Sequence, residues 1–91
     1  TVAPQALLMM NSPFVLQAAH DLATVALAAP GPDVARLSSV FVRVYGRPPS
    51  AEESQRLTRF LQELQPTVST TEAWAIVSQL LLASNEFSYV P

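Results

Sequence analysis

The chain contains no cysteine, and only two of its 91 residues are glycine. Without cysteine it forms no disulfide, offers no thiolate to a metal, carries no covalent haem motif and has no cysteine nucleophile. With two glycines it has neither a glycine-rich phosphate loop nor the nucleophile elbow of a serine hydrolase. These absences exclude several common kinds of active site and leave the redox compartment open.

Charge is also scarce, because only 13% of the residues are charged, none of them lysine, while 49% are hydrophobic. An average soluble domain is about 25% charged. A domain this small has a large surface for its volume, so apolar side chains must form part of that surface, and apolar patches usually mark contacts. The net charge of −2 gives no non-specific attraction to nucleic acid. We therefore expect a module that packs against neighbouring domains or a protein partner, with no nucleic-acid partner.

Long hydrophobic runs are missing too. The longest uncharged stretch, residues 1–19, is interrupted by Pro4 and Pro13, whereas about 18–20 consecutive apolar residues are needed to cross a bilayer. We predict no membrane span. The length fits one domain over residues 1–91, which we expect to be the C-terminal module of a larger protein, with its oligomeric state open.

Apolar residues recur at spacings of three and four, and no sustained alternation is present, so the sequence predicts an all-α fold. We expect a bundle of four principal helices plus a short N-terminal helix. The short helix is predicted over Pro4–Met10, and the others from Pro13 to about Ala29, between Asp33 and Gly46, between Ser50 and Pro66, and from Ser69 to Asn85.

Residues typical of helix ends support these boundaries. Ser12 and Asp33 are predicted to cap the helices that follow them. Ser50 and Glu53 have the spacing of a capping box. Gly46 is placed to take the left-handed conformation beyond the end of its helix.

Two of the predicted helices have distinctive apolar faces. The helix after Asp33 has one predicted buried face, made by Val34, Leu37, Val40, Phe41, Val44 and Tyr45. The last helix has only Ser78 and Gln79 as polar residues between Ala73 and Ala83. A helix that is apolar nearly all round is usually central, so we expect the other three to flank it.

Three stretches together resemble a known family. They are 4–15 (PQALLMMNSPFV), 45–53 (YGRPPSAEE) and, after Trp74, 79–90 (QLLLASNEFSYV). In this order and spacing they are similar to the C-terminal domain of unknown function of large planctomycete-type exported proteins that carry a cytochrome c-like domain. The resemblance implies an extracytoplasmic setting, periplasmic or secreted, and it implies neither an activity nor a substrate.

His20, the only histidine, is the first candidate site residue. On its predicted helix it shares a face with Gln17, Asp21 and Thr24, opposite an apolar side that includes Val25. It could act as a general base, or ligate haem together with Met9 or Met10. The spacing gives these roles no independent support, so we favour a solvated histidine and core methionines. We expect no bound cofactor and no metal, with the haem- or ligand-binding bundle as the alternative function.

Two further groups could make contacts. Arg36, Arg43 and Arg47 follow one side of the third principal helix and could receive an anion, although a solvated helix side explains them equally. Asn85, Glu86 and Tyr89 follow the most apolar helix and could form a site, but we favour simple helix termination there, with Asn85 in the left-handed conformation. No catalytic residues emerge, and a third possibility is the accessory wall of an enzyme whose catalytic groups lie upstream.

Overall fold

The computed structural model describes residues 12–88, with side chains described as far as Ser84. This part of the chain forms four α-helices and no strand, which confirms the all-α prediction. The helices are α2 (Pro13–Ala28), α3 (Asp33–Tyr45), α4 (Ala51–Leu64) and α5 (Thr70–Ser88). The short helix predicted over 4–10 lies outside the described residues.

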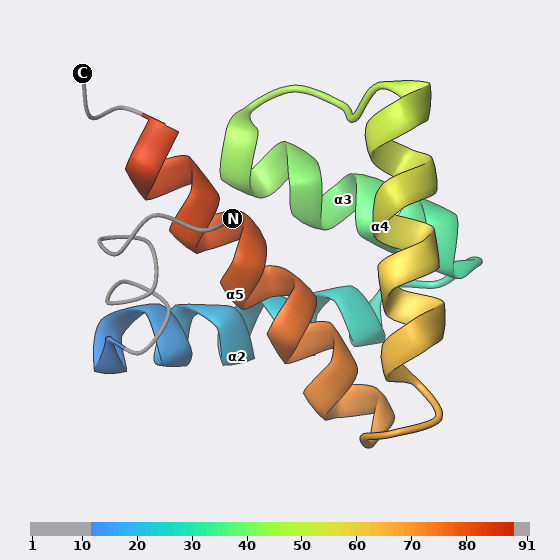
Figure 1. The fold of residues 1–91 in the computed structure, drawn as a ribbon, viewed down its shortest axis with the longest axis horizontal. Coiled ribbons are helices and arrows are strands. Elements are labelled where there is room, and N and C mark those ends of the chain that lie inside the picture. Colours follow the sequence, from blue (N-terminus) through green and yellow to red (C-terminus); the bar gives the residue numbers. More distant parts are fainter. Residues whose placement is uncertain (1–11, 89–91) are drawn as a thin grey trace.

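The last helix occupies the centre, as its apolar sequence predicted. α5 contacts each of the other three described helices and packs most extensively against α2, which it crosses in Figure 1. Its residues Ala73, Trp74 and Val77 are completely buried. The core continues from them into the buried faces of α2, α3 and α4, so all four helices share one core. None of the described helices is long and apolar enough to cross a membrane.

The helix ends follow the predicted chemistry at three places. Ser12 accepts a hydrogen bond from the Val15 backbone N–H at 3.4 Å, and Pro13 takes the first helical position. Ser50 and Glu53 form both hydrogen bonds of the capping box. Gly46 ends α3 in the left-handed region at φ 74°. These contacts are local, so short sequence patterns are enough to predict them.

Two predictions about helix ends were wrong. Asp33 is the first residue of α3 rather than its cap, because Pro32 holds the cap position. The Asp33 carboxylate lies 3.6 Å from the Arg36 guanidinium. Its negative charge still interacts favourably with the positive, N-terminal end of the helix. Asn85 does not end α5, which continues to Ser88. Residues 85–88 contain no glycine or proline, and nothing in their backbone chemistry stops a helix there.

Two apolar side chains expected to be buried are exposed. Val34 is 51% exposed, because the α4 residues facing it across a shallow hollow are polar, among them Ser54 and Thr58. Val25, expected on the apolar side of α2, is 40% exposed. The core-facing side of α2 instead centres on small residues such as Ala19 and Ala23, which let α5 approach closely.

Candidate interaction site

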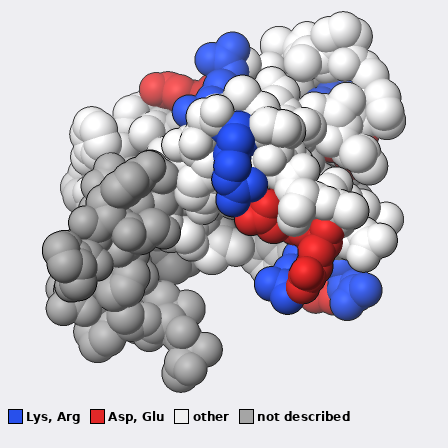
Figure 2. Space-filling view, turned by 90° about the horizontal axis from the view of Figure 1, so that it is seen from above, with Lys and Arg blue, Asp and Glu red and all other residues white. Residues whose placement is uncertain are grey.

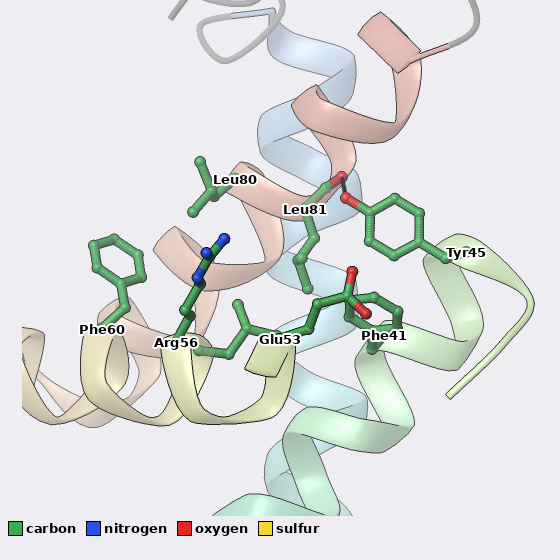
Figure 3. Close-up of a pocket in the computed structure, with 8 residues that line it drawn as sticks. Phe41, Tyr45, Glu53, Arg56, Phe60, Leu80 and Leu81 are labelled. Carbon is green, nitrogen blue, oxygen red and sulfur yellow. Dashed lines mark hydrogen bonds between the residues drawn. The ribbon is translucent and has the colours of Figure 1, made fainter. Parts of the chain in front are cut away.

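An apolar groove lies between α3, α4 and α5 and encloses a volume of about 360 Å³. Six of its lining residues are aromatic or aliphatic: Phe41, Tyr45, Leu57, Phe60, Leu80 and Leu81. Two charged side chains from α4, Glu53 and Arg56, complete the lining, as Figure 3 shows. The groove is open to solvent on one side. It therefore combines an apolar floor with one carboxylate and one guanidinium.

An aromatic and cationic stack forms one end of this groove. The rings of Phe41 and Tyr45, one turn apart on α3, have centroids 4.6 Å apart and planes tilted by 53°. The Arg47 guanidinium lies over the Phe41 ring, with its carbon 5.0 Å from the ring centroid. A cation at this distance is attracted by the negative face of an aromatic ring. The stack thus holds the end of α3 against the chain that leads to α4.

The same arginine binds the first turn of α4. Arg47 Nη1 and Nη2 donate to the two carboxylate oxygens of Glu53 at 2.9 and 3.1 Å. The Ser50 backbone N–H also donates to Glu53, as part of the capping box. These hydrogen bonds, the one from Arg47 first, lower the pKa of Glu53 to about 2. Glu53 is therefore an anion whose charge is already matched within the chain.

Tyr45 connects α3 to α5 at the same end of the groove. Its hydroxyl donates to the backbone carbonyl of Leu81 at 3.0 Å (Figure 3). Partial burial raises the pKa of the phenol, although a hydrogen bond with Ser84 acts in the opposite direction. The phenol is therefore a neutral hydrogen-bond donor at ordinary pH, and its role in the groove is to hold two helices together.

The polar face predicted around His20 lies on the exposed side of α2. His20, Gln17, Asp21 and Thr24 are all exposed. Gln17 Nε2 donates to the Asp21 carboxylate at 3.1 Å, and Thr24 Oγ1 donates to the backbone carbonyl of His20 at 3.0 Å. These bonds run along one helix surface, as on a solvated face. Met9 and Met10, the other residues of the haem hypothesis, lie outside the described residues.

The three predicted arginines have different surroundings. Arg36 Nε donates to the backbone carbonyl of Ala29 at 3.0 Å and so ties the end of α2 to the start of α3. Arg43 is exposed in the last turn of α3. Arg47 makes the contacts with Phe41 and Glu53 described above. Since a helix rises about 1.5 Å per residue, Arg36 and Arg47 are held at opposite ends of α3.

The predicted C-terminal residues are described only in part. Asn85 and Glu86 have helical backbone within α5, and their side chains lie outside the described residues, as does Tyr89. A role for these three residues stays a prediction. No group of three or more histidine, aspartate or glutamate side chains that could hold a metal occurs in the part of the chain that the structure describes.

The sequence analysis does not predict the groove, although it places Phe41 and Tyr45 on one apolar face of α3. In the structure Arg56, which lines the groove, pairs with Glu52. One feature of the sequence could have predicted the contact of Arg47 with α4. Arg47 and Glu53 are separated only by a short connector that contains two prolines. A connector this short places the arginine next to the first turn of α4.

The described residues form a compact all-α bundle of four helices, with the groove between three of them. The chain belongs to the family described as PSD1, a protein of unknown function (DUF1553), whose family model matches residues 1–61. This match covers α2, α3 and most of α4, and it confirms the resemblance to a domain of unknown function. Neither the curated proteins nor the solved structures give a match to this chain.

Proposed function

We propose that this chain is a non-catalytic helical module that packs against neighbouring domains of a longer protein or against a protein partner. The observation that carries the proposal is the set of large apolar side chains that α2 leaves exposed. Phe14 is 76% exposed, and Val25, on the same side of the helix, is also exposed, whereas the exposed Leu16 lies on another side. A contiguous apolar patch on the surface of a monomer usually marks a contact surface.

The spacing on α2 gives this surface a continuous shape. Phe14, Ala18, Leu22 and Val25 follow one another at intervals of four, four and three residues, which places them along one side of the helix. Ala18 and Leu22 are half-buried and connect the two exposed side chains. We call these four residues the α2 stripe. A partner that covers the stripe gains roughly 25 cal/mol for each Å² of apolar area removed from water.

The distribution of charge agrees with this role. On the face drawn in Figure 2, most of the described surface is uncharged, and the charged side chains gather in a few small groups. In α2, Asp21 is the only acidic or basic residue apart from His20. A partner that covers α2 therefore has to dehydrate few charged side chains.

The proposal includes the setting that the resemblance implies. In this setting the chain is the C-terminal module of a large exported protein with a cytochrome c-like domain. The covalent attachment to that protein would raise the effective concentration of the contact, so a modest apolar area would be sufficient. The haem-binding alternative depends on Met9 or Met10 approaching an exposed His20, and no contact of the described residues favours it.

Light scattering on a size-exclusion column tests the proposal directly. The isolated chain should show an average mass that rises with concentration, because the exposed apolar side chains of the α2 stripes of two molecules can cover each other. The double variant Phe14→Glu with Val25→Glu should remain at the monomer mass at every concentration. Thr24→Glu is the matched control, since it adds a carboxylate to the polar side of the same helix, and it should associate like the wild type.

Circular dichroism and thermal unfolding must show that all variants keep the fold. A wild-type chain that stays monomeric over the whole concentration range would contradict the proposal. So would equal loss of association in Thr24→Glu and in the double variant, because charge on α2 would then matter irrespective of the stripe.

A further inference from the structure

The two charged residues that line the groove between α3, α4 and α5 limit what the groove can bind. Its floor is apolar, and its two charged lining residues are Glu53 and Arg56. Glu53 receives two hydrogen bonds from Arg47 and one from the Ser50 backbone. A carboxylate that already accepts three hydrogen bonds, two of them from a guanidinium, has little capacity left for a ligand. Glu53 is therefore part of the wall of the groove rather than a contact for a ligand.

Arg56 differs from Glu53 in this respect. Its only partner among the described residues is Glu52, which Nη2 contacts one helical turn earlier. Both side chains are more than two-thirds exposed, at 74% and 71%. An exposed pair of this kind contributes little and exchanges easily. A guanidinium has five N–H donors, and Glu52 contacts only Nη2, so Arg56 keeps donors with no partner among the described residues that a ligand carboxylate could use.

The open side of the groove points to the kind of occupant. Pockets for free small molecules usually surround 70–90% or more of the ligand, and a groove open on one side does not do this. Contacts between proteins often insert one large apolar side chain into such a depression, while the surrounding surfaces exclude water. The volume of about 360 Å³ is large enough for one aromatic or large aliphatic side chain.

We propose that this groove receives an apolar side chain from an acidic protein segment, and that a carboxylate beside that side chain pairs with Arg56. The inference rests on the proposed function as an interaction module and adds a second contact, on helices other than α2. In the bound state the ligand carboxylate replaces Glu52 as the partner of Arg56. Phe60 and Leu80, which lie next to the Arg56 side chain in Figure 3, contact the inserted apolar group.

A peptide titration of the full chain tests this inference. The probe is acetyl-Glu-Leu-Phe-Glu-Leu-amide, with one control peptide that has Gln for both Glu residues and another that has Ala for Phe. Binding is followed by the backbone amide signals of the protein in NMR spectra. We expect the largest shifts around the groove, in α4 and α5. The alanine peptide should bind at least tenfold more weakly, because it lacks the apolar group that fills the groove.

Protein variants then separate the charge of Arg56 from charge in general. Arg56→Gln should weaken binding of the acidic peptide about three- to fivefold, as expected for an exposed ion pair, and the loss should shrink at high salt. Arg59→Gln is the matched control, because Arg59 is an exposed arginine on the same helix that lines a different hollow. It should leave the affinity unchanged. The glutamine peptide should bind wild type and Arg56→Gln equally, which shows that the two charges act on each other.

Three results would overturn the inference. The first is no binding of the acidic peptide to the wild type, and if the α2 stripe still drives association in that case, the proposed function survives. The second is an equal loss in Arg56→Gln and Arg59→Gln, which means non-specific attraction. The third is binding of free phenylpropionate at the groove as tightly as the peptide, which would identify a small carboxylic acid as the occupant.

Discussion

Trp74 Nε1 and Ser78 Oγ, one turn apart on the central helix α5, are both completely buried, and neither has a hydrogen-bond partner among the described residues. An indole N–H can only donate, and a hydroxyl can donate or accept. Buried polar groups of native proteins nearly always find a partner, and an unpaired one costs free energy. These two atoms therefore mark the place in the described core where hydrogen bonding is least complete.

The first prediction concerns Ser78→Ala. Removing the unpaired hydroxyl should raise the free energy of unfolding by about 1 kcal/mol, since the group was dehydrated without compensation and alanine also favours a helix. Denaturant unfolding measures the change. Ser54→Ala, at a half-buried site in α4, shows how much comes from helix preference alone. Destabilisation by Ser78→Ala would mean that the hydroxyl has a partner, such as a bound water.

The second prediction concerns the pH dependence of stability. Hydrogen bonds, first that from Arg47, lower the pKa of Glu53 to about 2 from its ordinary value of 4.5. A carboxylate with a lowered pKa stabilises the fold above its ordinary pKa, and this contribution disappears as the pH falls through the folded-state value. The melting temperature of Glu53→Gln should therefore be below that of the wild type at pH 6. The difference should shrink between pH 4.5 and pH 2.

The control for that experiment is Glu63→Gln, at an exposed position on the same helix. It should unfold like the wild type at pH 6, because Glu63 is remote from the Arg47 contact. If the gap between wild type and Glu53→Gln stayed constant from pH 6 to pH 2, the ion pair with Arg47 would not be what stabilises the junction.

The third prediction concerns Gly46, at the end of α3. Its φ of 74° lies in the left-handed region, and a Cβ placed there would meet no atom within 4 Å. Gly46→Ala should therefore destabilise the chain only through backbone strain, by about 1 kcal/mol. Gly46→Asn should lose less, because asparagine tolerates this conformation better. Thermal unfolding ranks the three chains, and equal stability of all three would argue against a strained turn.

The fourth prediction concerns the bond from Tyr45 to α5. Tyr45→Phe keeps the tilted ring contact with Phe41 and removes both hydrogen bonds of the hydroxyl, the one to the Leu81 carbonyl and the one with Ser84. The loss of these partly buried hydrogen bonds should cost at least about 1 kcal/mol of unfolding free energy. Hydrogen exchange of the α5 amides near Leu81 should also become faster. Unchanged exchange and stability would show that packing alone holds α3 against α5.

The sequence predicted those features of this protein that depend on neighbouring residues. The helix starts at Ser12 and Ser50, the left-handed Gly46 and the central position of α5 all follow from short-range hydrogen bonding or from one helix's own apolar pattern. These interactions are complete within a few turns of chain, so residue type and spacing are sufficient to identify them.

Tertiary structure decided which apolar side chains are covered and which charges meet. The periodicity of α3 marks Val34 as buried, yet the polar residues of α4 leave it exposed. The pairing of Arg47 with Glu53, its contact with Phe41 and the groove beside Arg56 all require two or three helices to be placed together. A helix pattern defines a face but not the neighbour that covers it, because packing depends on the shapes of both surfaces.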